Sequence, residues 1–206
     1  MEQKSDPAAQ VYGFVRGKVQ WLYDSRERSG TKATFARLRR GLGKQPGELP
    51  ELWEATLNGL PEELLSHSYD GAPSYGENAV HTALTLFALH QQGKDRSMYQ
   101  KDMPFGKAVR RLAPDSNSDK FAGVKRRFDA AATAQSFTEA VQHLRGLVQL
   151  LKASDIPLDY PALASELWRF QFPAQQNRVR LGWGQDFWRG NNTEDIESEE
   201  NPNEQQ

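Results

Sequence analysis

One stretch past the middle of the chain constrains the fold more than any other, because its apolar residues recur at helical spacing. Phe137, Val141, Leu144, Val148 and Leu151 follow one another at steps of four and three. A helix has 3.6 residues per turn, so this spacing places all five on one side. We predict a helix that packs this side against the core.

The sequence also indicates where this helix begins and what precedes it. Ser136 is followed three residues later by Glu139, the capping-box pattern in which the hydroxyl accepts from the N3 amide and the carboxylate accepts from the cap amide. The preceding stretch has its own apolar stripe at Phe121, Val124 and Phe128. The two stretches predict a helical hairpin that buries one side and exposes positive charge on the other.

The same period recurs along the chain. Residues 77–93 are apolar or small on most sides, so we expect a largely buried helix that is central to the first half. No stretch alternates convincingly at period two and no hairpin of the Asn-Gly type appears, so strands have little support and the predicted class is all-α. Further helices are predicted to begin at Ala8, Thr31, Pro50, Pro61, Pro104, Asp159 and Pro173.

The chain has a basic body and an acidic end. It contains 26 Lys and Arg and 27 Asp and Glu, and its formal net charge is −1. Six of the acidic residues and none of the basic ones lie in residues 191–206, so the remainder has 26 basic against 21 acidic residues, a net charge of +5. A basic body favours a polyanionic partner. The end, which has almost nothing apolar to bury, is predicted to be a disordered acidic tail over residues 191–206.

Several classes of chemistry lack the residues that they need. The chain has no cysteine, which excludes disulfides, thiolate nucleophiles and thiolate metal sites. It contains no GxxxxGK[ST], GxGxxG or HExxH motif. Neither a secretory leader nor an apolar run of about 18 residues occurs. We therefore predict a cytoplasmic protein that is not an enzyme and has no cofactor, no metal site and no membrane contact.

The histidines give little support to a metal or catalytic site. His81 and His90 lie nine residues apart on one predicted helix, which is not a spacing that places two ligands on one side. Glu77 and His81 are four apart, but such pairs are common hydrogen bonds on helices. We interpret these histidines as ordinary core or surface residues.

Basic residues cluster on four predicted helices and give a stronger signal. Each cluster alone is typical of a solvated helix face, but four of them on a body of net positive charge favour binding to phosphates. Such binding is independent of sequence, since phosphates are identical along a strand. The clusters are Arg37, Arg39 and Arg40; Lys107, Arg110 and Arg111; Lys120, Lys125, Arg126 and Arg127; and Arg178, Arg180 and Arg189.

Stacking of tryptophans on bases is a weaker alternative. The chain has five tryptophans, and aromatic rings can stack on the bases of single strands. Trp53, Trp168 and Trp183 fall on apolar stripes, however. We predict that these three belong to the core.

Four stretches, read in order, resemble one family. They are ARLRRGLGKQPGELPELW (residues 36–53), KRRFDAA (125–131), HLRGLVQLLKASDIPLDYPALASELWRF (143–170) and VRLGWGQDFW (179–188). With them, residues 8–190 resemble the CasB family, the small subunit of the type I-E CRISPR Cascade effector complex. The resemblance implies two small helical bundles packed end to end. We place them on either side of the loop near residue 115, at residues 8–113 and 119–190.

The resemblance also implies a function. CasB proteins have no known catalytic role and are present as two copies along the inner side of the guide-RNA complex. They look like scaffolds that hold the guide RNA and the target strand and retain the displaced strand on a basic surface. The implied partners are therefore guide RNA, target and non-target DNA, other Cascade subunits and a second copy of the chain. The exchange of strands in an R-loop is nearly balanced in free energy, so such contacts to the backbone can favour its formation. R-loop formation is a step of antiviral defence.

The basic residues in the matching stretches are the candidates for these contacts, and two alternatives stay open. A purely structural adaptor would use the same basic faces to contact other subunits. A helical metal-dependent nuclease would depend on His81. The nucleic-acid-binding candidates are Arg39, Arg40, Lys125, Arg126, Arg127, Arg178 and Arg180, while Lys107, Arg110 and Arg111 rest on charge alone.

Overall fold

The structure, a computed structural model, describes residues 6–189 and is all-α, as predicted. Within that range no strand occurs, although Tyr99 and Leu158 form an isolated parallel bridge. The predicted acidic tail lies outside the described residues. The helices are α1 (Pro7–Asp24), α2 (Ser29–Arg40), α3 (Trp53–Thr56), α4 (Tyr75–Gln91), α5 (Phe105–Arg110), α6 (Asp119–Thr133), α7 (Phe137–Ala153), α8 (Tyr160–Phe170) and α9 (Pro173–Arg189), with 3-10 turns at Pro50–Leu52 and Glu62–Leu64.

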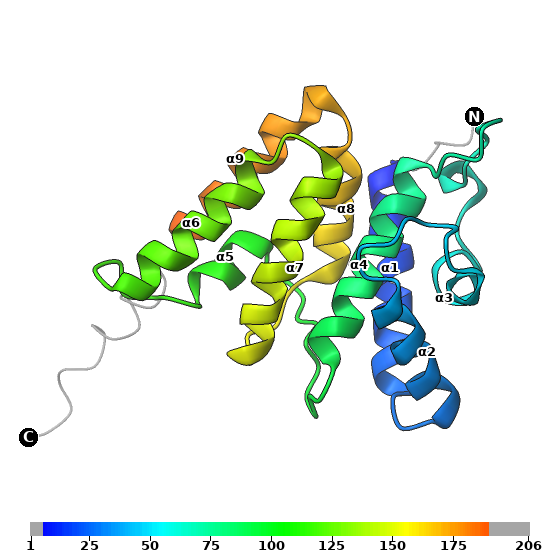
Figure 1. Cartoon of the computed structure of the whole chain (residues 1–206), viewed down its shortest axis with the longest axis horizontal. Helices are drawn as coiled ribbons and strands as arrows, with labels where there is room; N and C mark the ends of the chain where they lie inside the picture. The colour runs from blue at the N-terminus through cyan, green and yellow to red at the C-terminus, as the bar shows by residue number, and fades with distance from the viewer. Residues whose placement is uncertain (1–5, 190–206) are drawn as a thin grey trace, which may run out of the picture.

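α4 is the central helix that its sequence predicts. Every residue from Ala79 to Gln91 is buried, and α1, α2, α7 and α8 all pack against it (Figure 1). A helix that is apolar or small on most sides is stable only when neighbours surround it. A capping box fixes its start, because Ser74 Oγ accepts from the Glu77 amide at 2.9 Å and Glu77 Oε2 accepts from the Ser74 amide at 2.7 Å.

α6 and α7 pack against each other as the predicted hairpin. On α7, Leu144, Val148 and Leu151 are buried, as predicted. Phe137 and Val141 are only partly buried. Phe137 nevertheless packs against the core, as predicted, whereas Val141 does not belong to the core cluster and lines a pocket between α4 and α7. The prediction of a continuous core stripe is therefore wrong at Val141.

The predicted capping box at the start of α7 forms only in part. Ser136 Oγ accepts from the Glu139 amide at 3.1 Å, as expected. Glu139 Oε2, however, accepts from the amide of Gln135 at 2.8 Å rather than from that of Ser136. The carboxylate thus reaches one residue further back and ties down the loop between α6 and α7.

Two other local predictions are wrong. α2 begins two residues before Thr31, so Thr31 lies inside the first turn, where its hydroxyl donates to Ser25 Oγ at 3.0 Å. Trp53 is 46% exposed rather than part of the core. The reason is that α3 is a single turn, which buries Thr56 and the preceding Leu52 instead.

Helices on either side of the predicted domain boundary share one core. α1 and α4 pack against α8, and α5 packs against α9, so both sets of contacts bridge the loop at residues 114–118. The buried apolar residues of these helices form a single cluster. The division into bundles at residues 8–113 and 119–190 stays a prediction.

α5 approaches α9 closely at Gly106. A Cβ atom on Gly106 would lie 2.1 Å from the carbonyl oxygen of Trp183 and 2.7 Å from the amide nitrogen of Phe187. Both are backbone atoms, so neither can move without shifting α9. Beside this contact the rings of Phe105 and Trp183 meet edge to face, with centroids 4.9 Å apart. Trp183 is fully buried here, as predicted.

We expect Gly106→Ala to lower the free energy of unfolding by about 3 kcal/mol, because the added methyl group forces α5 and α9 apart. The matched control is Gly146→Ala on α7, where an added Cβ meets no atom within 4 Å. That change should raise the free energy of unfolding by about 1 kcal/mol, since alanine is the better helix former. Urea unfolding measures both variants, and equal stability of the two would contradict the close approach.

The carboxyl group of Glu166 is enclosed between α8 and α9. Its Oε2 atom accepts a hydrogen bond from the indole Nε1 of Trp183 at 2.7 Å. Burial raises the pKa of Glu166 to about 7; the negative charges of Asp186 and Asp159 raise it too, while the Trp183 hydrogen bond and Arg169 lower it. Glu166 therefore titrates near neutral pH.

We expect ionisation of Glu166 to reduce stability as the pH rises from 4.5 to about 7. The folded state holds this proton more tightly than the unfolded chain, so the stabilisation is complete below the ordinary pKa of 4.5 and is lost as the pH rises through about 7. Glu166→Gln keeps an acceptor for Trp183 without the charge. Thermal unfolding should find this variant more stable than the parent above pH 7 and similar to it near pH 4; a difference that does not change with pH would contradict the titration.

Candidate nucleic-acid interface

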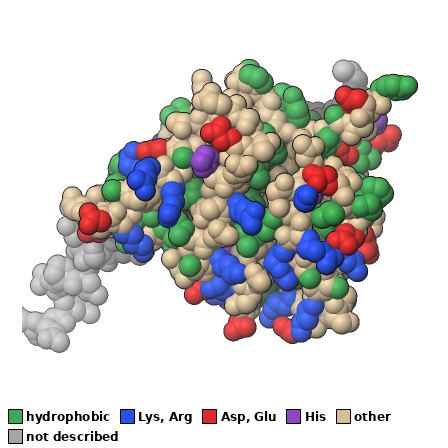
Figure 2. All heavy atoms as spheres, in the orientation of Figure 1, with side chains coloured by type: hydrophobic (Ala, Val, Ile, Leu, Met, Phe, Trp, Pro, Cys, Tyr) green, Lys and Arg blue, Asp and Glu red, His purple; other side chains and the backbone are tan. Residues whose placement is uncertain are grey.

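Three helix ends bring together a group of basic side chains, Arg39, Lys94 and Lys152, which we call the basic cluster. Arg39 lies in the last turn of α2, Lys152 lies in the last turn of α7, and Lys94 follows the end of α4. Arg39 and Lys94 line the same pocket, of about 400 Å³. Figure 2 shows Lys and Arg side chains gathered over these ends. Basic residues are favoured there because the last carbonyls of a helix carry partial negative charge.

The like charges of the basic cluster repel one another. Burial lowers the pKa of Lys152, and the neighbouring charges of Lys94 and Arg39 lower it further. Burial also lowers the pKa of Arg39. Like charges held together raise the free energy of the unoccupied surface, and a bound polyanion relieves this repulsion.

Groups of the chain itself balance part of this charge. Lys94 Nζ lies 2.6 Å from a carboxylate oxygen of Asp155. Lys152 Nζ donates a hydrogen bond to Gln92 Oε1 at 3.0 Å, which does not neutralise it. The basic cluster thus keeps a net positive charge at the surface.

α6 carries a second basic area, Lys120, Arg126 and Arg127, which we call the α6 surface. All three side chains are exposed. Figure 2 shows basic side chains over α6 on the same face of the molecule as the basic cluster. Lys125, predicted with them, pairs instead with Asp129 at 2.6 Å.

The remaining predicted residues differ in how accessible they are. Arg40 donates to Glu51 Oε1 from Nε at 3.0 Å and from a terminal nitrogen at 2.7 Å, so its charge is paired. Lys107 is partly buried on α5. Arg111 and Arg178 are exposed. The structure therefore brings only some of the predicted side chains to one surface.

Arg110 is enclosed in the structure, and we correct its placement at a phosphate-binding surface. The residue is 2% exposed. It donates hydrogen bonds to the carbonyl oxygens of Ala113 and Pro114, and its guanidinium lies 4.7 Å from the ring centroid of Phe121. Arg110 therefore fastens the end of α5 and the following loop to α6, and a phosphate cannot reach it.

Arg180 also serves packing. One of its terminal nitrogens donates to the carbonyl oxygen of Ala134 at 2.7 Å, which ties α9 to the end of α6. Its guanidinium lies 5.6 Å from the ring centroid of Phe170. Arg180 is half-buried, so it contributes less to the surface charge than the sequence suggests.

Two basic residues that the sequence clusters omitted line a further pocket. Arg145 lies on α7, and Lys44 lies in the loop after α2. Arg145 and Lys152 are seven residues apart on α7, which places them on the same side of that helix. This spacing is the one sequence signal that could have grouped Arg145 with Lys152. The search for runs of basic residues missed both, because neither has a basic neighbour in the sequence.

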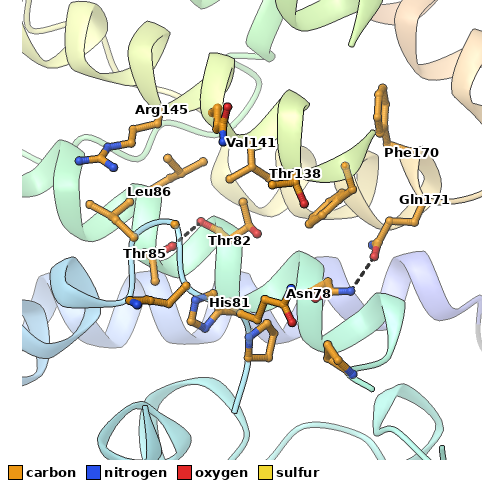
Figure 3. Close-up of a pocket in the computed structure, with 18 of the residues that line it drawn as sticks. Asn78, His81, Thr82, Thr85, Leu86, Thr138, Val141, Arg145, Phe170 and Gln171 are labelled. Atoms are coloured by element: carbon orange, nitrogen blue, oxygen red, sulfur yellow. Dashed lines mark hydrogen bonds between the residues drawn. The ribbon is translucent and has the colours of Figure 1, made fainter. Parts of the chain in front are cut away.

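The pocket lies between α4 and α7, has a volume of about 550 Å³, and is called here the α4–α7 pocket. The loop after α2 forms one of its sides. Figure 3 shows Thr138 and Val141 of α7 facing His81 of α4, with Arg145 at one end and Gln171 at the other. Arg145, which lines the pocket, lies on α7 seven residues before Lys152 of the basic cluster.

The structure confirms that His81 and His90 are core residues. His81 Nε2 lies 3.1 Å from the carbonyl oxygen of Gly41, and His90 Nδ1 lies 2.8 Å from the Tyr160 hydroxyl. Burial lowers the pKa of both, that of His90 to about 4. Among residues 6–189, no three His, Asp or Glu side chains are grouped so that they could hold a metal ion. In the same range no helix has the length and apolar character needed to cross a membrane.

Comparison with known proteins gives consistent matches. Residues 34–188 match the sequence profile of a family described as CRISPR-associated protein Cse2 (CRISPR_cse2). The chain is similar to CasB from Thermobifida fusca, with 36% identity, a TM-score of 0.72, and coverage of 86% of this chain and 97% of that one. No curated protein matched.

Two more distant structures have the same fold. CasB from Thermus thermophilus has 21% identity and a TM-score of 0.61, with 84% of this chain and 97% of that one covered. A chain of a structure described as a CRISPR RNA-guided surveillance complex has 19% identity and a TM-score of 0.69, with 92% and 99% covered. The match to the family profile, together with the closer similarity to the Thermobifida protein, confirms the resemblance: the chain belongs to the CRISPR-associated Cse2 family, whose members include CasB.

Proposed function

We propose that this Cse2 family member is a non-catalytic subunit of a CRISPR RNA-guided surveillance complex and binds nucleic-acid backbone without reading its sequence. The strands that it would hold are the guide RNA with its target and the displaced DNA strand. Opening a duplex against a guide is nearly balanced in free energy, so contacts to the backbone favour the open R-loop. Its other partners would be further subunits of the complex and a second copy of the chain.

The basic cluster is the observation that carries this proposal. Arg39, Lys94 and Lys152 are brought together at the ends of three helices; burial lowers the pKa of Lys152 most, and the repulsion from Lys94 and Arg39 lowers it further. A bound strand of phosphates would offset that repulsion and release the counterions around it. Side chains aimed at single phosphates carry no base specificity.

The distribution of charge fits a polymer better than a small anion. Figure 2 shows basic side chains over α6 and over the ends of α2, α4 and α7 on one face of the molecule, called here the basic face. Arg145 lies on α7, the helix that packs beside α6. A strand laid across this face would meet positive charge at several separate places. A small anion would occupy only one of them.

Protein contact through α9 is a second candidate, favoured by a separate observation. Leu181 is 62% exposed and Trp188 is 55% exposed. Large apolar side chains at a surface are typical of contacts with another protein. An adaptor protein would bind its neighbours through these apolar side chains and would also contact other subunits through its basic face.

We expect charge reversal on the basic face to weaken binding of unrelated single-stranded DNA sequences by the same factor. The test variants are Arg126→Glu with Arg127→Glu on the α6 surface, and Arg39→Glu with Lys152→Glu in the basic cluster. Each should also reduce the dependence of log Kd on log salt by roughly one unit for every phosphate that the variant no longer binds. Fluorescence anisotropy at several salt concentrations measures both quantities.

The control carries the same change of charge elsewhere. Arg16→Glu on α1 with Lys101→Glu in the loop after α4 replaces two exposed basic residues outside both basic areas. This variant should bind nearly as the parent does. Losses that differ between sequences would contradict backbone binding, whereas normal DNA affinity with failed assembly of the complex would support the adaptor.

A further inference from the structure

The base of the α4–α7 pocket is apolar. Leu86 of α4 is fully buried beneath it. Phe137 and Val141 of α7 also line it and are only partly buried, so their apolar faces remain open to whatever enters. Its volume of about 550 Å³ lies within the roughly 300–1,000 Å³ that is usual for small-molecule sites. A flat ring would find both space and an apolar surface here.

The walls of the pocket offer polar groups that the chain leaves unused. The described part of the chain provides no hydrogen-bond partner for the side chains of Thr138, Gln142 and Gln176. A side-chain amide both donates and accepts, as the edges of nucleobases do. Unused groups of this kind around an apolar base are suited to a planar polar ligand.

One polar group of the pocket is held in a defined orientation. Asn78 Nδ2 donates to Gln171 Oε1 at 2.9 Å (Figure 3). Gln171 Nε2 in turn donates to the carbonyl oxygen of Tyr75 at 2.9 Å. These bonds determine which end of each amide is oxygen. They leave the carbonyl oxygen of Asn78 as a positioned acceptor in the pocket wall.

The rim of the pocket is positively charged. Arg145 is exposed and lies at one end of the pocket (Figure 3). Lys44 and Glu48 also line the pocket, but they pair with each other at 3.2 Å, so the positive charge at the pocket comes from Arg145. A cation at the mouth suits a ligand that carries a phosphate outside the pocket and a ring inside it.

We propose that the α4–α7 pocket receives an unstacked nucleobase of a single strand whose phosphates lie on the basic face. The inference rests on the proposed function and adds a contact to a base. The ring packs on Phe137 and Val141, its edge meets the amides, and Arg145 contacts the adjoining phosphate. Aromatic and apolar surfaces of this kind accept any base, so the contact adds affinity with little sequence preference.

A peptide segment is the other ligand that such a pocket can take. The nucleobase is favoured because the unused groups are amides and hydroxyls around one compact cavity, and because the cationic rim continues into the basic cluster along α7. A peptide would be favoured by an extended groove with backbone partners along it. A comparison of strands with and without bases separates the two.

The test compares a labelled single-stranded DNA with a strand of the same length in which every nucleotide is abasic. Both carry the same phosphates, so backbone binding alone gives equal affinities. Anisotropy with the full chain should find the strand with bases bound roughly tenfold more tightly. In Thr138→Leu with Gln142→Leu, which narrows the pocket and removes two polar groups, this preference should disappear while the affinity for the abasic strand is unchanged.

The matched control makes the same two replacements at exposed positions away from the pocket. It is Thr133→Leu on α6 with Gln185→Leu on α9, and it should keep the preference for bases. The unchanged affinity of the pocket variant for the abasic strand shows that it has folded.

Each other outcome overturns the inference in a distinct way. Tight and equal binding of both strands by the parent chain would exclude the base contact but leave backbone binding standing. A preference that survives in the pocket variant would place the bases elsewhere. Failure to bind either strand would overturn the proposed function and the base pocket together.

Discussion

Burial of α4 on nearly every side is the constraint on which the rest of the structure depends. A helix with so little polar surface must be surrounded, and the chain does this with α1 and α2 from one side of the 114–118 loop and α7 and α8 from the other. The segments that cover α4 are therefore far apart in the sequence. This requirement explains why residues on both sides of the loop share one core.

The same arrangement produces the charged surface. α2, α4 and α7 end close to one another, and the basic residues at their ends are brought into one cluster. Helix ends favour such residues one helix at a time, since the last carbonyls carry partial negative charge. The repulsion arises only when three ends meet. Where α4 and α7 are not fully packed against each other, the α4–α7 pocket remains, lined by the polar positions of α4.

Neighbouring basic residues turned out to have different surroundings. Arg110 is enclosed beside Phe121, whereas the next residue, Arg111, is exposed. Successive residues of a helix point about 100° apart, so one member of a pair can face the core while the other faces solvent. A count of arginines thus overstates the charge available to a strand. The exposed Arg126 and Arg127 of α6 are better placed to meet phosphates than Arg110 or Arg180.

The sequence by itself determined the all-α class, the central position of α4, and the beginnings of α7 and α8 at Ser136 and Asp159, because periodicity and caps act within a few residues. Only the tertiary structure decided that Arg110 is enclosed and that Arg39 and Lys152 are neighbours. It also decided that the apolar stripe of α7 ends in a pocket. Those features depend on which helices meet, and contacts between residues that are distant in the sequence leave no local pattern to read.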